Sequence, residues 1–309
     1  MLKVNNIHKT FGTIQAVKGI SFEVEPGEFY GLLGPNGAGK STIINIISTV
    51  LQPDQGTVFI DGSDTSRNNE SSKYAIGIVP QEIALYEMLS AWDNLKFWGS
   101  LYNLPAKELK SNITRTLKLL GLGDRKDHKI STYSGGMKRR INIAAALLHQ
   151  PKLLLMDEPT VGIDPQSRNL IFEVLEHLNM EGMTIIYTTH YMEEAERLCK
   201  KIGIIDHGEI IAQGNLKQLK NLVTSKESIK VTTDSMEESV RSSIIDHWGD
   251  KVKLNDHQLI FETDHADQHL SEYIGSLNQF GVPIKNIAIQ PVNLETIFMQ
   301  LTGRQLRDK

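Results

Sequence analysis

The sequence has a single cysteine, no long apolar run and no excess of basic residues. Because Cys199 has no second cysteine to pair with, a disulfide within the chain is excluded, and the composition fits a reducing compartment. The longest apolar stretches, such as AAALL and KLLLM, are far shorter than a membrane-spanning helix. The opening MLKVNNIHKTFG lacks the pattern of a signal peptide. We therefore expect a cytoplasmic protein that reaches a membrane only through a partner.

The charge balance points away from nucleic acid. The chain has 33 Lys and Arg against 37 Asp and Glu, a formal net charge of −4, whereas nucleic-acid-binding domains are usually basic. We therefore expect no nucleic-acid partner. The length of 309 residues predicts one large domain and a smaller one.

The order of local patterns predicts an α/β protein. Segments rich in β-forming residues, LKVNNIHKTF and ISFEVEPGEFYGLLG, are joined by Gly and Pro turns and predict antiparallel hairpins. Residues 86–122 have a helical pattern that places Trp92, Leu95, Trp98 and Leu101 on one buried face. The later runs KLLLMDE and MTIIYTTH are continuously apolar, which is typical of buried parallel strands with helices between them.

The pattern changes near Asn221, where the polar, turn-like segment NLVTSKES begins. From there the sequence predicts the order βαββαβ and a last helix from Leu294, which is typical of a small ferredoxin-like α+β domain. We predict a first domain over residues 1–221 and an accessory domain over residues 222–309. The segments predicted in the accessory domain are strand 229–233, helix 236–248, strands 251–254 and 258–263, helix 266–280 and strand 283–290.

A phosphate-binding loop is predicted by GLLGPNGAGKST, which has the spacing G-x-x-x-x-G-K-[ST] between the apolar strand FYGLL and the helix TIINIIS. Its glycines allow backbone N–H groups to surround phosphates, and the helix N-terminus favours an anion. Lys40 would reach the β- and γ-phosphates and the Ser41 hydroxyl would hold Mg²⁺; the alternative, a chance glycine turn, does not explain the flanking strand and helix. The predicted loop residues are Gly34, Pro35, Asn36, Gly37, Ala38, Gly39, Lys40, Ser41 and Thr42.

Two adjacent carboxylates follow the apolar strand in KLLLMDEP. Asp157 stands where a second anchor for the metal is expected. Glu158 could polarise a water that attacks the γ-phosphate, which a transferase would not need, so Glu158 indicates hydrolysis. The alternative for both residues is a solvated strand end.

Two further polar residues also follow β-runs. His190 ends TIIYTTH and would lie near the γ-phosphate if its strand neighbours that of Asp157; otherwise it is a polar cap on a core strand. Gln81 follows YAIGIVP and, taken alone, would be a polar loop residue.

Together these motifs resemble the nucleotide-binding subunit of the ATP-binding cassette (ABC) transporters, over about residues 1–220. The resemblance implies a P-loop NTPase cassette with a mixed-sheet core, an antiparallel β subdomain and a helical subdomain. It implies hydrolysis of ATP with Mg²⁺, with Asp157, Gln81 and Ser41 at the metal, Gln81 also at the water, Glu158 as general base and His190 at the γ-phosphate. The motifs, in order, are the P-loop at 34–41, Gln81, YSGGM at 133–137, LLLMDE at 153–158, Asp164 and His190.

The resemblance also implies a composite site. In the family, Ser134, Gly135 and Gly136 would bind the γ-phosphate of ATP held by a second subunit, so a head-to-tail homodimer would enclose two ATP molecules. Asp164 would contact the opposite subunit. Phe11 would stack on adenine; the alternative is a buried edge-strand phenylalanine.

The segment around the two glycines departs from the family's commonest motif, LSGGQ. Tyr133 and Met137 replace Leu and Gln, while the Ser-Gly-Gly core is intact. We interpret Lys138, Arg139 and Arg140 as a solvated helix face.

YSGGMKRR is similar to the variant found in ABC-2-type exporters, and PVNLETIFMQLTGRQLRD resembles the closing segment of their C-terminal domain, notably in drug- and antibiotic-resistance exporters. We therefore expect an ATPase subunit that drives export of a drug, antibiotic or lipid-like compound through a separate integral membrane permease. Residues 81–122 would pass motion to the permease, and the accessory domain would serve dimer contact or regulation.

Two alternatives belong to other classes. An importer ATPase can also carry a βαββαβ ligand-sensing domain, but the signature variant and the tail favour export. A soluble ABC ATPase of DNA repair would need a long coiled-coil insertion, and a ribosomal one a second cassette, and the sequence has neither.

Overall fold

The computed structural model describes residues 1–65, 70–223, 227–264, 266–290 and 292–303. It divides into two compact units between Lys217 and Gln218, and each is described by itself. Across the described ranges, no helix is long and apolar enough to span a membrane.

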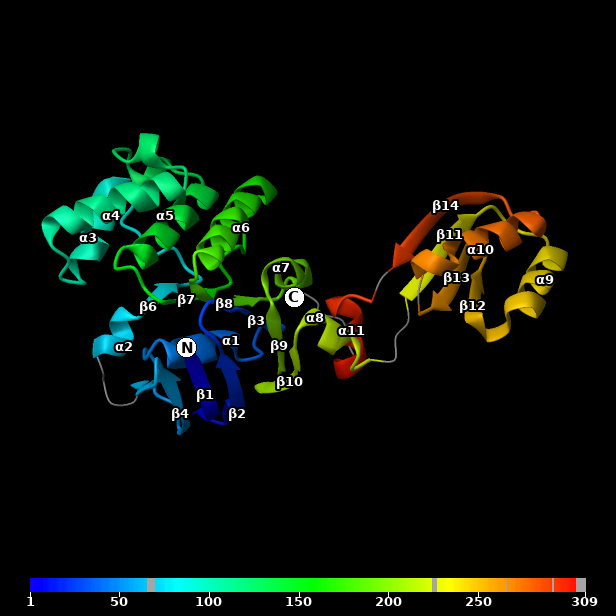
Figure 1. Ribbon diagram of the computed structural model, residues 1–309, viewed down its shortest axis with the longest axis horizontal. Helices are drawn as coiled ribbons and strands as arrows, with labels where there is room; N and C mark the ends of the chain where they lie inside the picture. Colours follow the sequence, from blue (N-terminus) through cyan, green and yellow to red (C-terminus); the bar gives the residue numbers. More distant parts are fainter. Residues whose placement is uncertain (66–69, 224–226, 265, 291, 304–309) are drawn as a thin grey trace. The chain divides into compact units, whose positions relative to one another are not determined.

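The first unit combines two sheets with helices that lie beside them (Figure 1). Its strands are β1 (Leu2–Phe11), β2 (Ile14–Val24), β3 (Phe29–Leu33), β4 (Gln55–Ile60), β5 (Ser63–Asp64), β6 (Ile76–Val79), β7 (Leu153–Asp157), β8 (Thr184–Thr189), β9 (Lys201–Asp206) and β10 (Glu209–Gly214). Its helices are α1 (Lys40–Ile47), α2 (Glu70–Tyr74), α3 (Ala91–Ser100), α4 (Ala106–Leu119), α5 (Gly135–Leu147), α6 (Pro165–Met180), α7 (Met192–Leu198) and α8 (Leu216–Lys220), the last of which crosses the division.

The central sheet has the strand order β10-β9-β3-β8-β7-β6, in which β10 is antiparallel to β9 and the other pairs are parallel. Every residue of β3, β7 and β8 is buried, as the continuous apolar runs predicted. Because the strands β3, β8, β7 and β6 are parallel neighbours, the segments that follow them all emerge at one edge of the sheet. This edge receives the P-loop, His190, the Asp157–Glu158 pair and Gln81.

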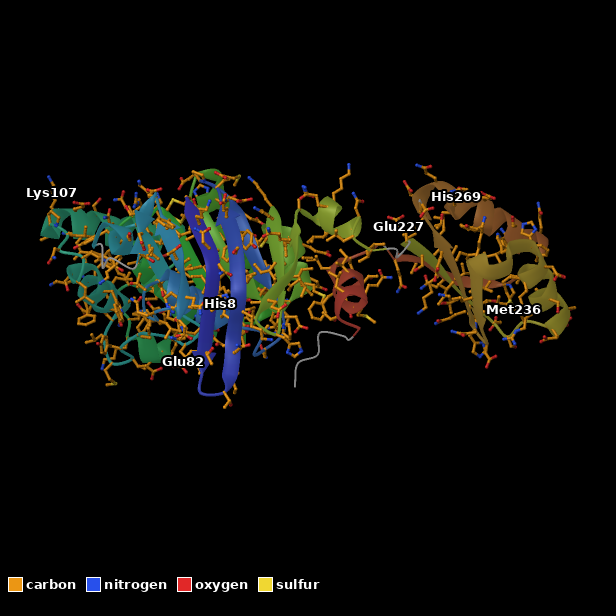
Figure 2. The ribbon with its side chains drawn as sticks, turned by 90° about the horizontal axis from the view of Figure 1, so that it is seen from below. His8, Glu82, Lys107, Glu227, Met236 and His269 are labelled. Atoms are coloured by element: carbon orange, nitrogen blue, oxygen red, sulfur yellow. The ribbon has the colours of Figure 1, made fainter. Side chains whose placement is uncertain are left out.

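The second sheet is the antiparallel β subdomain, with the order β2-β1-β4-β5. Figure 2 shows β1, which carries His8, alongside β2, and the hairpin closes where Phe11 pairs with Ile14. Alternate residues of β1, including Leu2 and Val4, enter the core while their neighbours face solvent.

Helices α3, α4 and α5 form the helical subdomain (Figure 1). Ser90 caps α3 by accepting a hydrogen bond from the Asp93 amide, and Leu95 lies in the core with Ile113 of α4. Trp92 and Trp98 pack against the same cluster, whereas Leu101, predicted on the buried face, is 58% exposed.

The second unit contains the predicted βαββαβ order. Its sheet is antiparallel throughout, with the order β12-β13-β11-β14, which is the ferredoxin-like arrangement. Ile229, Val231 and Phe261 on one sheet face pack with Ile244 and Leu277 of the helices. The elements are β11 (Glu227–Thr233), α9 (Glu238–Trp248), β12 (Val252–Asn255), β13 (Gln258–Thr263), α10 (Ala266–Gln279), β14 (Ile284–Gln290) and α11 (Leu294–Thr302).

Candidate nucleotide-binding site

The predicted phosphate loop turns from β3 directly into α1. Gly39 stands at the N-cap of α1 with φ 107°, and a Cβ there would lie 2.6 Å from the Ala16 carbonyl oxygen, so only glycine fits. No side chain caps the helix, which leaves its first-turn amides available to an anion. The Gly34 amide donates to the Thr189 carbonyl oxygen at 3.2 Å, so the loop is joined to the end of β8.

Lys40, the first residue of α1, is only 4% exposed. Its ammonium group donates to the carbonyl oxygens of Gly34 at 2.7 Å and Pro35 at 3.0 Å, and it pairs with Glu158 Oε1 at 2.8 Å. These three partners use all three N–H donors of the side chain.

Asp157, the last residue of β7, and Glu158, which follows it, are both buried, so neither is a solvated strand end. Glu158 has a left-handed backbone with φ 44°, and its Oε2 lies 3.0 Å from Nδ1 of His190. The Glu158 amide donates to Thr188 Oγ1, which donates to Asp157 Oδ1 at 2.7 Å. Since β8 pairs with β7, the strand of His190 neighbours that of Asp157, and the His190 ring lies at the Glu158 carboxylate.

A cavity of about 310 Å³ brings six of the nine predicted loop residues together with Gln81 and Glu158, whereas Gly34, Pro35 and Ala38 do not line it. Phe11 does not line it: it ends β1 with 48% of its surface exposed, so the alternative of a buried edge-strand phenylalanine is wrong. The lining residues are Ala16, Asn36, Gly37, Gly39, Lys40, Ser41, Thr42, Gln81 and Glu158.

Ser134, Gly136 and Asp164 meet at a separate surface, where the N-termini of α5 and α6 adjoin. Ser134 caps α5 by accepting from the Met137 amide at 3.2 Å, and Asp164 caps α6 by accepting from the Ser167 amide at 2.9 Å, which lowers the pKa of its carboxyl. A Cβ at Gly136 would lie 2.2 Å from Ser167 Oγ, so this glycine is needed for packing.

Gly135 has a different environment from Gly136. The nearest atom to a Cβ at Gly135 is Ile163 Cδ1 at 3.9 Å, and the residue is exposed. The Gly135 position is therefore open to an approaching ligand.

The solvated face predicted for residues 138–140 is wrong for Arg139, which is 3% exposed. Its guanidinium donates to the Pro80 and Gln81 carbonyl oxygens, and burial lowers its pKa. A run of three basic residues gives no sign that the middle one is buried, because the acceptors come from a distant segment.

Glu194 of α7 is a second buried residue that the sequence did not reveal. Its carboxylate accepts hydrogen bonds from Thr160 Oγ1 at 2.7 Å, Tyr187 OH at 2.9 Å and Thr189 Oγ1 at 2.8 Å. It therefore joins the segment after Glu158 to the end of β8, next to His190.

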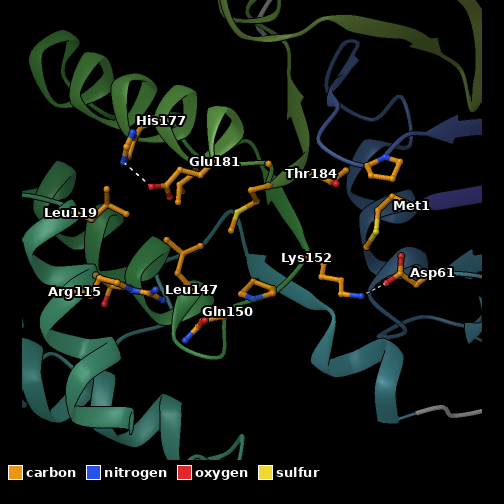
Figure 3. Close-up of a pocket in the computed structure, with 16 residues that line it drawn as sticks. Met1, Asp61, Arg115, Leu119, Leu147, Gln150, Lys152, His177, Glu181 and Thr184 are labelled. Carbon is orange, nitrogen blue, oxygen red and sulfur yellow. Dashed lines mark hydrogen bonds and ion pairs between the residues drawn. The ribbon is translucent and has the colours of Figure 1, made fainter.

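A larger cavity, of about 640 Å³, lies at the opposite edge of the sheet, where β7 and β8 begin (Figure 3). Ion pairs at its rim join Lys152 to Asp61 at 2.7 Å and His177 to Glu181 at 3.4 Å. None of the predicted site residues lines it, so it is separate from the phosphate loop.

Comparison with known proteins agrees with this geometry. The family model described as ABC transporter matches residues 17–161. The linearmycin resistance ATP-binding protein LnrL of Bacillus subtilis (strain 168) is 46% identical over 314 residues, covering 100% of both chains. The Nod factor export ATP-binding protein I of Cupriavidus metallidurans is 35% identical over 308 residues, covering 100% of this chain and 99% of that protein.

Solved structures are similar over most of the chain. One, the structure of an ATP binding subunit of an ABC transporter, has a TM-score of 0.66 at 28% identity, and the match covers 72% of this chain and 92% of that one. Another, a dimeric post-hydrolysis state of an ATP-binding cassette bound to ADP and Pi, has a TM-score of 0.64 at 29% identity and covers 70% and 98%.

The chain belongs to the ABC transporter ATP-binding proteins, and the predicted fold class is confirmed. Within this family it is an ATPase of the export type: it binds and hydrolyses ATP to energise export.

Proposed function

We propose that the phosphates of ATP bind at residues 34–42 and that Glu158 polarises the attacking water. The observation that carries this proposal is the buried Glu158 carboxylate, held between Lys40 at 2.8 Å and His190 at 3.0 Å in the wall of the phosphate-loop cavity. A carboxylate that can accept a proton at this position suits general-base catalysis of hydrolysis.

The Lys40 contacts suggest how phosphate binding prepares this base. Because all three donors of Lys40 are used, a phosphate oxygen can bond to its ammonium group only by replacing one partner. Replacement of Glu158 exchanges one anion for another, so the charge of Lys40 stays compensated. Glu158 would then keep His190 as its partner and have Oε1 available for water.

The oxygen donors near the phosphate loop fit Mg²⁺, which prefers hydroxyl, carboxylate and amide oxygens. Ser41 and Gln81 line the cavity, and Asp157 is oriented by Thr188. We assign these three residues, Ser41, Gln81 and Asp157, to the metal. When bound, Mg²⁺ would neutralise charge on the β- and γ-phosphates.

The group at Ser134, Gly135, Gly136 and Asp164 would complete the site of a second copy. It is separate from the cavity around Lys40, and Gly135 and Asp164 are exposed. The start of α5 offers backbone amides and the positive end of a helix dipole to a γ-phosphate. These features support a head-to-tail homodimer that encloses two ATP molecules, with Phe11 stacked on adenine in each.

We further propose that the transported compound is a drug, antibiotic or lipid-like molecule and that a separate integral membrane permease carries it. The relatives named for linearmycin resistance and Nod factor export support this class. An exposed apolar cluster in the segment 83–97 supports docking of the permease. Through the permease, the chain would lie on the inner face of the cell membrane. The cluster consists of Ile83, Tyr86, Met88, Leu89 and Phe97.

The accessory unit that begins at Gln218 would contribute dimer contact or regulation. Its sheet carries a helical layer on one face, and the opposite face carries polar side chains, such as Lys230, Thr232 and Glu262, together with Ile260.

A trapping experiment tests the proposal. Tagged Glu158→Gln protein would be held with Mg-ATP in solubilised membranes of the native host, and its partners identified by mass spectrometry. Recovery of a polytopic permease without an extracytoplasmic binding protein supports export. Recovery of a binding protein supports import, and recovery of ribosomes or DNA-associated proteins contradicts a transport role.

A further inference from the structure

Helix α5 begins at the proposed partner-facing surface and also holds the segment that carries Gln81. We propose that Arg139, assisted by Asn142, is a positioning residue that sets where Gln81 lies and thereby couples the two ATP sites of a dimer. The coupling rests on the proposed function, whereas the clamp on the Gln81 segment stands on contacts within this chain.

Arg139 binds two consecutive backbone carbonyl groups, those of Pro80 and Gln81. Its NH1 donates to the Pro80 carbonyl oxygen at 2.6 Å and its NH2 to the Gln81 carbonyl oxygen. The side chain is 3% exposed, so water does not compete for these acceptors. Hydrogen bonds from a charged donor are stronger than neutral ones, and the planar guanidinium can hold two acceptors in a fixed geometry.

Asn142 continues the clamp from the same face of α5, three residues after Arg139. Its Nδ2 donates to the Glu82 carbonyl oxygen at 3.4 Å, and its Oδ1 accepts from the Ala84 amide at 3.3 Å. Asn142 is also buried. The backbone from residue 80 to residue 84 is therefore held at four points by two side chains of one helix.

The clamp joins the N-terminus of α5, which would face the partner's ATP, to Gln81, which lies beside the chain's own ATP site. The N-terminus of α5 carries Ser134 and Gly135, which would meet the γ-phosphate bound by the partner. About one turn later, the same helix holds the Gln81 backbone beside its own cavity. A shift of α5 on contact with the partner's ATP therefore moves Gln81, and by reciprocity the position of Gln81 biases α5.

Kinetics of a double-mutant cycle test whether Arg139 acts through Gln81, the link on which the coupling depends. Arg139→Met keeps the apolar stem and removes the donors, and Arg115→Met, an exposed arginine on α4, is the matched control. We expect Arg139→Met to lower kcat at least about 10-fold with little change in KM, since a displacement of about 1 Å can cost ~100-fold. In a Gln81→Ala background the same change should cost less than about 2-fold, because the residue acts only through Gln81.

A spin label next to Gln81 measures the mobility of the clamped segment without relying on ATP hydrolysis. Glu82 is exposed at the surface of the first unit (Figure 2), and Glu82→Cys provides a nitroxide site. All variants carry Cys199→Ser, because the native thiol is only partly buried and could also react with the label. We expect a more mobile spectrum with Arg139→Met, an intermediate one with Arg139→Lys, and no change with Arg115→Met.

The outcomes distinguish this inference from the proposed function. An unchanged spectrum with Arg139→Met, or an equal loss of kcat in both backgrounds, overturns the positioning role while leaving Glu158 as the base. If Gln81→Ala itself leaves kcat unchanged, the proposed role of Gln81 fails and the coupling with it. A mobile spectrum combined with loss of kcat only in the presence of Gln81 supports the inference.

Discussion

Replacement of Glu158 by Gln should both stop turnover and tighten ATP binding. Lys40 and Glu158 are 2.8 Å apart, and both side chains are nearly inaccessible to water. The Gln side chain has the same shape but no charge, so it cannot act as general base and holds Lys40 less strongly. A phosphate that takes the place of Glu158 at Lys40 therefore meets less competition in the variant.

The size of both effects follows from the burial of the pair. Loss of a general base lowers kcat by about 10²–10⁴-fold. At 2.8 Å the attraction between the two charges is about 6 kcal/mol for an effective dielectric constant of 20, and desolvation of both groups offsets much of it. The amide of the Glu158→Gln variant still accepts a hydrogen bond from Lys40, but it should hold Lys40 about 1–3 kcal/mol less strongly than the carboxylate does. Because ATP competes for Lys40, its affinity should become about 10–100-fold tighter.

The rate of phosphate release measures kcat, and calorimetric titration with ATP at fixed free Mg²⁺ measures the affinity for ATP. Glu193→Gln, the same substitution at an exposed residue of α7, is the matched control and should leave both unchanged. Size-exclusion chromatography with ATP should show the Glu158→Gln protein as a dimer. Retention of kcat within about 10-fold would remove Glu158 from the base role. ATP binding weaker than that of the parent chain would refute the competition for Lys40.

Three further predictions concern other residues. Lys40→Ala should abolish ATP binding in the same titration, and unchanged affinity would mean that the phosphate-loop assignment is wrong. Phe11→Ala should weaken ATP binding while leaving inorganic triphosphate binding unchanged; equal weakening of the two ligands would contradict stacking on adenine. Burial lowers the pKa of His149, whose Nε2 bonds to the Ile76 carbonyl oxygen at 2.8 Å, so the folded chain takes up a proton there less readily than the unfolded chain. Stability against urea should therefore fall as pH drops below 6.5 toward the lowered pKa, and by less in His149→Gln; an identical decline in both proteins would exclude His149 as a source.

Most of the fold and the phosphate loop could be predicted from the sequence, because the patterns that indicate them lie within short segments of the chain. The phosphate loop needs glycines at fixed spacing next to a strand and a helix, and a buried parallel strand is a continuous apolar run. The neighbours of a strand in the sheet are not local, so the position of His190 near the γ-phosphate could only be predicted on the condition that its strand neighbours that of Asp157.

Residues that act through distant partners were not predictable in this way. Arg139 stands in a basic run that is typical of a solvated face, and only the fold brings the Pro80 and Gln81 carbonyls to it. Glu194 lies in an ordinary acidic helical segment, and its three hydroxyl partners come from two other segments. The packing reason for Gly136 likewise depends on Ser167, which follows it only after the rest of α5, the strand β7 and a loop.

The place of β3 in the central sheet has a consequence for synthesis of the chain. This strand leads into the phosphate loop, yet it lies between β8 and β9, where Gly31 pairs with Tyr187 and Ile202. At about 5–20 residues per second, a ribosome needs on the order of 10 s to reach those partners after β3 has emerged. During that interval the apolar segment FYGLL has no strand to complete its hydrogen bonds. Nascent chains that stop before β8 therefore expose an unpaired apolar strand, and the nucleotide site is among the last parts of the first unit to become complete.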